Sequence, residues 1–306
     1  MCRLHSWGWQ KLCSRVRFPG LLCCVLALGG CVGQVAKTPP PAGQSSVAFG
    51  HVFIVVEENH NYSDVVASPA MPYLNNLANQ YGLATNYFAN AHPSIPNYFM
   101  LTAGRFESLN NAFSGTVSDD NVVRELVKAG KTWRSYAESL PKTGYTGGDA
   151  YPYFKHHDPF VYLSDVVGTP QANNVVPFSQ FSSDLASNTL PDFSFIVPNV
   201  LNDAHDGSLS AADQWLSTNI DPLIKSSAFQ SGGVLIIVFD EGDISDLSHG
   251  GGHVPFVIVG PHVKSAFRSS TFYQHQSTLR LVLSTLGINS FPGAAASAPD
   301  MSEFFK

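Results

Sequence analysis

Short continuous apolar runs alternate with longer amphipathic segments along most of the chain. The runs are rich in β-branched and aromatic residues, and polar residues do not interrupt them. This pattern is typical of strands that are buried on both faces of a mainly parallel sheet. We predict four such strands, over residues 51–56, 193–197, 234–239 and 254–259.

Segments with helical periodicity lie between these strands. The segment 119–129 begins with acidic residues, which favour the start of a helix, and ends before Gly130, which favours its end. The segment 211–226 is amphipathic, and the segment 274–286 ends before Gly287. Strands that alternate with helices predict an α/β fold, a three-layer sandwich with a mainly parallel central sheet.

Three of the four predicted strands run directly into polar residues at their carboxyl ends. The letters EENH follow the first strand from Glu57, NDAHD lies shortly after the second from Asn202, and DEGD follows the third from Asp240. Ligands of open α/β sheets bind outside the carboxyl ends of the strands. We therefore expect these polar residues to form one site.

Two of these polar segments carry adjacent oxygen donors. Glu58 and Asn59 form one pair, and Asp240 and Glu241 form the other. Clustered carboxylates repel one another, and a hard divalent cation such as Mg²⁺, Ca²⁺ or Mn²⁺ is a common way to hold them together. The alternative is that acidic residues after a strand cap the next helix. Two such pairs favour one divalent metal ion, whose identity the oxygen donors leave open.

The segment HPSIPNY, from His92 to Tyr98, predicts the beginning of a helix. Ser94 is expected as its N-cap, with Pro96 in the first turn. Free backbone amides at such an end bind phosphate groups, so Ser94 is either a plain cap or a nucleophile beside a bound phosphate. The local sequence leaves both interpretations open.

Histidines accompany these segments. His156 and His157 precede an aspartate, His205 lies among aspartates, and three glycines precede His253. A run of glycines lets the backbone approach a ligand closely, although a single histidine is more often a structural hydrogen-bonding residue. The sequence has no G-x-S-x-G segment, which argues against a serine esterase of the α/β-hydrolase type.

The beginning of the chain has the features of an export signal. A basic start is followed by the apolar run FPGLLCCVLAL at 18–28, which is the pattern of a secretory leader. The run ends in LGGC, which resembles the lipobox of bacterial lipoproteins and nominates Cys31 for lipidation. The alternative is an ordinary leader with a chance cysteine. We expect a signal peptide at 1–30, a Pro/Ser-rich tether at 31–46 and one domain at 47–306.

Composition narrows the class of protein. The 306 residues include 17 Lys+Arg and 23 Asp+Glu, are 44% hydrophobic and are only 13% charged. This excludes a disordered chain and a nucleic-acid binder with a basic surface. Removal of the leader would remove four basic residues and no acidic one, which changes the net charge from −6 to −10. Anionic lipid would not attract such a chain, so acyl groups on Cys31 would provide the anchor in the cell envelope.

Six segments together resemble a known family. They are VVEEN from Val55, HPSIPNY from His92, HHDPF from His156, NDAHD from Asn202, FDE from Phe239 and GGGHVP from Gly250. Their order is that of the bacterial phosphoesterase family of acid phosphatases and non-specific phospholipases C, distant relatives of alkaline phosphatase. The resemblance implies an alkaline-phosphatase-like sandwich.

The resemblance also implies roles for individual residues. It implies Ser94 as the nucleophile, with His157 and His205 in contact with phosphate oxygens or the leaving group. It implies a metal ion held by Glu58, Asn59, Ser94, Asp240 and Glu241. It implies substrate contacts from His92, Asn97, Asp203 and His253.

We therefore expect a metal-dependent phosphatase that hydrolyses small phosphate monoesters through a phosphoserine, with His205 protonating the leaving alcohol. The first alternative is a phosphodiesterase of the phospholipase C type. That branch follows its Asp-Glu pair with His-Gly-Gly-Phe, whereas Gly242, Asp243 and Ile244 follow Glu241 here. The second alternative is a non-catalytic surface lipoprotein that binds phosphate or metal. No protein partner is implied.

Overall fold

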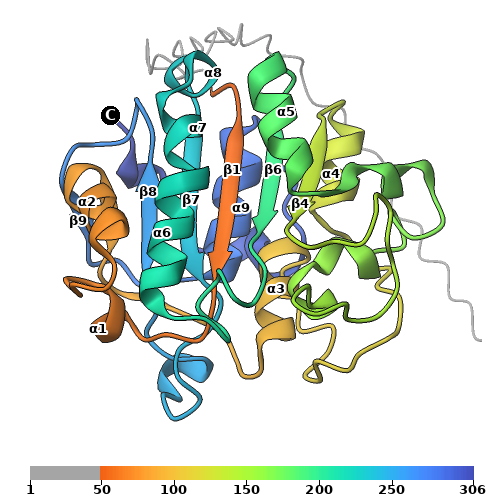
Figure 1. Ribbon diagram of the computed structural model, residues 1–306, viewed down its shortest axis with the longest axis horizontal. Helices are drawn as coiled ribbons and strands as arrows, with labels where there is room; N and C mark the ends of the chain where they lie inside the picture. Colours follow the sequence, from red (N-terminus) through yellow and green to blue (C-terminus); the bar gives the residue numbers. More distant parts are fainter. Residues whose placement is uncertain (1–48) are drawn as a thin grey trace, which may run out of the picture. The chain divides into compact units, whose positions relative to one another are not determined.

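The computed structural model describes residues 49–306, and the predicted leader and tether lie outside this range. An eight-stranded sheet forms the centre of the fold, with the order β5-β4-β6-β1-β7-β8-β2-β9 (Figure 1). Its strands are β1 (Val52–Glu57), β2 (Gly82–Ala84), β4 (Trp133–Ala137), β5 (Val175–Pro177), β6 (Phe193–Val197), β7 (Val234–Phe239), β8 (Phe256–Val259) and β9 (Phe267–Ser269). A separate two-stranded sheet pairs β3 (Tyr87–Phe88) with β10 (Tyr273–Gln274).

Helices cover both faces of the large sheet. Figure 1 shows α5, α6 and α7 in front of the sheet and α9 behind it, where α9 packs against α3 and α4. The helices are α1 (Tyr62–Val65), α2 (Pro72–Gln80), α3 (Ser94–Thr102), α4 (Val122–Lys128), α5 (Ser179–Ser187), α6 (Leu209–Asn219), α7 (Asp221–Lys225), α8 (Ser227–Gln230) and α9 (His275–Thr285). Short 3-10 helices include η1 (Lys155–His157), η2 (Pro159–Tyr162), η3 (Pro170–Asn174), η4 (Ser248–Gly250), η5 (Gly293–Ser297) and η6 (Ser302–Phe304).

The predicted α/β sandwich with a mainly parallel sheet is confirmed. β1 runs parallel to β6 and β7, and β4 runs parallel to β5 and β6, whereas β8 is antiparallel to β7 and β2. The predicted helix over 211–226 is divided into α6 and α7. Pro222 lies in the first turn of α7 and has no N–H group, so it begins a new helix more readily than it continues one.

The centre of the sheet fixes the position of the polar loops. Every residue of β1 and β7 is buried, and the two strands pair in register from Val52 with Val234 to Glu57 with Phe239. Glu58 and Asp240 are the residues that follow these paired strands. They therefore leave the sheet side by side. No helix within residues 49–306 is both long and apolar enough to cross a membrane.

Candidate active site

The loops after three central strands meet at the carboxyl edge of the sheet, as expected. The N–H group of Glu58 donates to the carbonyl oxygen of Asp203 at 2.8 Å, which joins the loop after β1 to the loop after β6. The N–H group of Asp240 donates to the carbonyl oxygen of Glu57 at 2.9 Å, which joins β7 to β1. The backbone thus brings acidic side chains from three loops together.

Ser94 lies between two of these acidic side chains. Its Oγ is 3.0 Å from Oε1 of Glu241 and 3.3 Å from Oε2 of Glu58, and its side chain is buried. The prediction that Ser94 is the N-cap is wrong, because Pro93 occupies that position and Ser94 is the first residue of α3. The hydroxyl makes no capping bond, so its proton is directed to the carboxylates instead.

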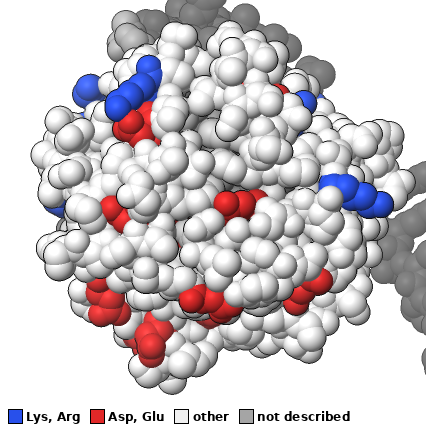
Figure 2. All heavy atoms as spheres, viewed as in Figure 1, with Lys and Arg blue, Asp and Glu red and all other residues white. Residues whose placement is uncertain are grey.

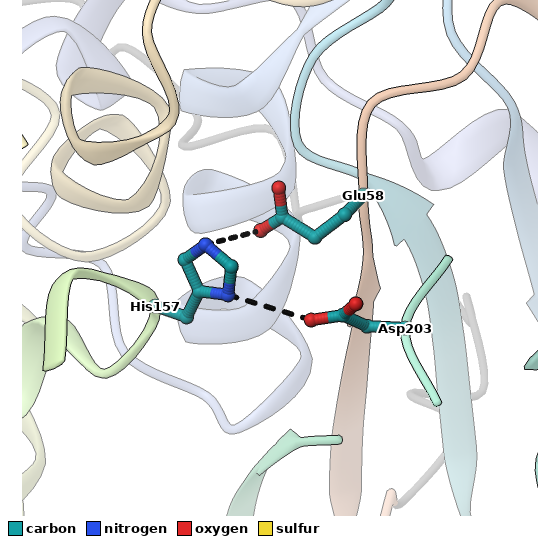
Figure 3. Close-up of side chains that lie close together, drawn as sticks. All are labelled: Glu58, His157 and Asp203. Atoms are coloured by element: carbon teal, nitrogen blue, oxygen red, sulfur yellow. Dashed lines mark ion pairs between the residues drawn. The ribbon is translucent and has the colours of Figure 1, made fainter. Parts of the chain in front are cut away.

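His157 lies on the other side of Glu58. Figure 3 shows its imidazole ring between the carboxyl groups of Glu58 and Asp203. Nε2 is 3.3 Å from Oε1 of Glu58, and Nδ1 is 3.4 Å from Oδ2 of Asp203. Both carboxyl groups and the ring are almost completely inaccessible to solvent. Glu58 therefore connects the serine on one side to the histidine on the other.

Burial shapes the protonation of this cluster. Burial, and then the negative charge of Asp240, raise the pKa of Glu58 well above its ordinary value. Burial and the neighbouring Glu241 do the same for the pKa of Asp240. Burial raises the pKa of Asp203 to about 8 and lowers the pKa of His157 to about 3. A neutral imidazole therefore lies among acids that repel one another, and a cation would relieve this repulsion.

The donors in this cluster fit a divalent cation. Oδ2 of Asp240, Oδ2 of Asp203 and Nε2 of His157 are buried and have no hydrogen-bond partner. Donor atoms of Glu58, His157 and Asp203 all lie within 4.8 Å of one another, so this buried group could hold a metal ion. A buried polar atom without a hydrogen-bond partner destabilises the fold unless a bound ion or a proton satisfies it. The predicted oxygen set overlaps with this group at Glu58.

The remaining predicted metal ligands lie at the same place. Oδ1 of Asp240 accepts a hydrogen bond from the N–H group of Asn59 at 3.3 Å. The backbone of Asn59 has a φ of 59°, in the left-handed region that asparagine tolerates better than most residues. This conformation begins the turn that carries the chain from β1 across the Asp240 side chain. Glu58, Asn59, Asp240, Glu241 and Ser94 are therefore brought together.

Two predicted substrate contacts, His92 and Asn97, have hydrogen-bond partners within the protein. Nδ1 of His92 is 2.5 Å from Oε2 of Glu241, and Nε2 donates to the carbonyl oxygen of Asp246 at 3.0 Å. The amide oxygen of Asn97 accepts the N–H groups of Asn90 and Ala91, and its nitrogen donates to the carbonyl oxygen of Ala91. These bonds occupy both ring nitrogens of His92 and both polar atoms of Asn97, so the assignment of these residues to the substrate stays a prediction.

The other two predicted substrate contacts, Asp203 and His253, also have neighbours within the protein. One carboxylate oxygen of Asp203 faces the ring of His157. The other accepts a hydrogen bond from the backbone N–H group of His205 at 2.8 Å, so Asp203 helps to position both residues. The ring of His253 is stacked against Tyr62, with 4.4 Å between ring centroids. Within residues 49–306, no hydrogen bond or ion pair joins the His253 side chain to the acidic cluster. Its burial in an aromatic stack explains its position.

His205 lies at the outer side of the cluster. Its ring centroid is 5.4 Å from that of His157, and its Nδ1 is 2.8 Å from Oδ1 of Asp206. A quarter of its side chain is exposed, whereas the side chain of His157 is only 1% exposed. His205 is therefore the histidine that a molecule entering from solvent meets first.

Two residues of the site, Tyr98 and His275, were not predicted from the sequence. The hydroxyl of Tyr98 donates to Oε1 of Glu58, and Nε2 of His275 donates to the carbonyl oxygen of Asp240 at 2.6 Å. Tyr98 lies one helical turn after Ser94 on α3, and that spacing was a usable signal. The position of His275 at the start of α9 gave no such signal.

The surface outside the site is acidic. On the face drawn in Figure 2, most acidic side chains gather toward the lower edge, to which β1 runs in Figure 1, and Lys and Arg lie higher. Asp206 and Asp243 are exposed on loops that follow β6 and β7, and Asp64 is exposed on α1, the short helix after β1. This distribution favours attraction of a cation to the carboxyl edge.

Known proteins resemble this chain over most of its length. The model of the Phosphoesterase family matches residues 67–289. The phosphatidylinositol-3-phosphatase of Mycobacterium tuberculosis is 34% identical over 281 residues, which are 90% of this chain and 88% of that protein. The acid phosphatase of Aspergillus fumigatus is 30% identical over 86% of this chain, and the phosphate-repressible acid phosphatase of Penicillium chrysogenum is 32% identical over 82%. The matches span only 61% and 62% of those fungal enzymes.

Solved structures share the fold at low sequence identity. A protein of the alkaline phosphatase superfamily from Vibrio parahaemolyticus superposes with a TM-score of 0.58 over 78% of this chain and 67% of its own, at 14% identity. The lipoteichoic acid synthase LtaP from Listeria monocytogenes gives a TM-score of 0.59 over 79% of this chain and 73% of its own, also at 14% identity. The likeness confirms the predicted alkaline-phosphatase-like architecture.

Proposed function

The chain belongs to the Phosphoesterase family and is a phosphoric ester hydrolase, and from this premise we propose that it hydrolyses phosphate monoesters through a phosphoserine on Ser94. The observation that supports this proposal most directly is the position of the Ser94 hydroxyl. It is buried at the carboxyl edge of the sheet, 3.0 Å from Glu241 and 3.3 Å from Glu58. A serine needs an adjacent base to become a nucleophile, and both carboxylates are within reach.

The first proposed step is attack on phosphorus. Oγ of Ser94 forms a bond to the phosphorus atom while its proton passes to Oε1 of Glu241. The bond between phosphorus and the ester oxygen breaks, and His205 gives a proton to the departing oxygen. The products of this step are phosphoserine and the free alcohol. Water then attacks the phosphorus atom and gives a proton to His205. The bond between phosphorus and Oγ breaks while Glu241 returns its proton to Oγ, which releases inorganic phosphate and restores the Ser94 hydroxyl.

We propose that one divalent cation is held by Glu58, Asn59, Ser94, Asp240 and Glu241. When bound, such an ion neutralises charge on the phosphoryl oxygens and lowers the pKa of the serine hydroxyl. The buried Oδ2 of Asp240, which has no hydrogen-bond partner, supports this proposal. Glu58, His157 and Asp203 form a second possible ligand group, whose imidazole nitrogen suits an ion such as Zn²⁺ better than Mg²⁺ or Ca²⁺.

A phosphorylated lipid is a second candidate substrate. The relative named phosphatidylinositol-3-phosphatase is 34% identical and is matched over 88% of its length, which favours a lipid monoester over a lipid diester. The diester alternative predicts release of diglyceride from phosphatidylcholine, whereas monoester hydrolysis releases inorganic phosphate. Measuring both products from the same preparation separates the two activities.

The central experiment compares Ser94→Ala with the unaltered protein on an aryl phosphate. We expect kcat/KM to fall by at least about 10³-fold, since the nucleophile is lost, with an unchanged circular dichroism spectrum. Ser277→Ala is a matched control, because Ser277 is also buried on a helix and its hydroxyl has no hydrogen-bond partner. Near-normal hydrolysis by Ser94→Ala would refute the assignment of the nucleophile.

We also propose export and lipid anchoring through Cys31, supported by the basic start, the apolar run and the LGGC segment. A radiolabelled or clickable fatty acid fed to expressing cells should label the protein, and Cys31→Ser should prevent the labelling. Label in the Cys31→Ser variant would place the acyl group elsewhere and contradict this proposal.

A further inference from the structure

Phe154 contacts the two histidines on the outer side of the site. Its ring centroid is 5.5 Å from that of His205 and 5.7 Å from that of His157, with nearly perpendicular planes. Phe154 immediately precedes η1, which carries His157, and its own side chain is half-buried. An aromatic surface therefore adjoins the side of the cluster on which the ester oxygen leaves in the proposed reaction.

Tyr151 extends this aromatic surface to solvent. Its ring centroid is 6.2 Å from that of Phe154, and 62% of the residue is exposed. From Glu58 through His157 and His205 to Tyr151, exposure rises from 0% to 62%. The reactive groups are thus connected to the surface along a line of rings.

The turn that carries Tyr151 is tightly held. The N–H group of Ala150 donates to the carbonyl oxygen of Tyr153 at 2.9 Å, and the reciprocal bond measures 3.0 Å. Oδ1 of Asp149 accepts the N–H group of Lys155 at 2.8 Å, which closes the base of the loop. An exposed aromatic ring on a rigid turn loses little conformational entropy when it binds a ligand.

The geometry points to a leaving-group subsite, formed by Tyr151 and Phe154, that binds the flat apolar ring of an aryl phosphate. This inference rests on the proposed function, because it uses His205 as the group that faces the departing oxygen. When the bond from phosphorus to that oxygen breaks, the organic part of the substrate lies on the His205 side. There it meets two aromatic rings, which favour another ring over a small polar alcohol.

The test compares phenyl phosphate with glycerol 2-phosphate. For Tyr151→Ala we expect kcat/KM for phenyl phosphate to fall about 3- to 10-fold, the loss typical of one aromatic contact, with less than a twofold change for glycerol 2-phosphate. Tyr151→Phe keeps the ring and should retain the selectivity. Each substrate is compared with itself between variants, so differences in intrinsic reactivity cancel.

Phe106→Ala provides the matched control. Phe106 is 51% exposed on the loop after α3, and no ring contact joins it to another aromatic residue or histidine within residues 49–306. Phe106→Ala should leave kcat/KM unchanged for both phenyl phosphate and glycerol 2-phosphate. Equal losses on both substrates for Tyr151→Ala, or the same selective loss for Phe106→Ala, would overturn the subsite.

Inhibition by phosphonates measures binding without turnover. Phenylphosphonate should inhibit the unaltered protein more strongly than methylphosphonate, and Phe154→Leu should reduce that ratio of inhibition constants at least threefold. If Phe154→Leu does not fold, the same ratio of inhibition constants, measured on Tyr151→Ala and Tyr151→Phe, tests the subsite. If the unaltered protein hydrolysed neither phenyl phosphate nor glycerol 2-phosphate, the proposed function would be refuted. If the protein were active but the variants left the selectivity for the aromatic compound unchanged, only the subsite would be refuted.

Discussion

Nδ1 of His92 lies 2.5 Å from Oε2 of Glu241, and the other oxygen of that carboxylate lies 3.0 Å from the Ser94 hydroxyl. The hydrogen bond to Glu241 raises the pKa of His92. Because Nε2 of the same ring donates to the carbonyl oxygen of Asp246, the imidazole is held at both ends. His92 is therefore a positioning residue that fixes the orientation of Glu241.

Replacement of His92 should lower the affinity for the activating metal ion more than it lowers the stability of the fold. Loss of a group that orients a metal ligand typically costs 10- to 100-fold in metal affinity or activity. We expect His92→Gln to raise the half-activating concentration of divalent metal by about that factor, with activity restored at high metal. His253→Gln, which alters a half-buried histidine in an aromatic stack, is the control. An unchanged metal titration for His92→Gln would contradict this role.

Metal removal should abolish activity and lower stability together. The carboxyl groups of Glu58 and Asp240 are buried side by side, so an ion that binds only the folded protein stabilises it by mass action. After dialysis against a chelator we expect loss of aryl phosphate hydrolysis and a lower Tm, and both should recover with one of Mg²⁺, Ca²⁺, Mn²⁺ or Zn²⁺. Full activity after exhaustive chelation would exclude metal dependence.

The central part of the fold was predictable from the sequence. The strands predicted over 193–197 and 234–239 coincide with β6 and β7, because uninterrupted apolar runs of that length are hard to place except in a buried strand. The short strands β2 and β9, at one end of the sheet, were not predicted. Each has three residues, and its pairing with distant segments gives no local signal.

The site was predictable in its residues but not in its internal contacts. The acidic pairs were recognised because they follow strands, and the parallel order of the sheet brings such positions together. Which residue faces which depends on loop geometry that no local pattern encodes. The bond from His92 to Glu241 and the bonds from Asn97 to the backbone of its own turn were therefore not predicted.

Acid should remove a specific part of the stability of the fold. Burial alone would raise the pKa of Asp184, but hydrogen bonds from Tyr136, Arg134 and Gln180 outweigh it and keep that pKa below its ordinary value. A carboxylate with a lowered pKa stabilises the fold fully above its unfolded pKa of about 3.9. The stabilisation is lost as the pH falls through the lower pKa of the folded state.

Asp184→Asn tests this dependence on pH. We expect it to lower the free energy of unfolding by about 2 kcal/mol at pH 7, as for loss of hydrogen bonds to a buried charge. The difference from the unaltered protein should shrink as the pH falls through the lowered pKa of Asp184 in the folded state, because both side chains are neutral below it. Urea unfolding at several pH values measures it, with the exposed Asp64→Asn as a control. A difference that does not vary with pH would show that the charge of Asp184 is unimportant.

Two buried tyrosines should respond in opposite ways to loss of the hydroxyl. The hydroxyl of Tyr98 donates to Glu58, whereas the buried hydroxyl of Tyr153 has no hydrogen-bond partner. Tyr98→Phe removes the hydroxyl that donates to Oε1 of the buried Glu58 carboxyl group, so we expect a loss of about 1–3 kcal/mol in stability and a lower kcat. Tyr153→Phe removes an unsatisfied polar atom and should leave the free energy of unfolding unchanged or raise it. Urea unfolding and aryl phosphate kinetics on both variants measure the contrast. Equal destabilisation by the two substitutions would mean that ring packing alone, and not the hydrogen bond to Glu58, explains why Tyr98 is buried beside the site.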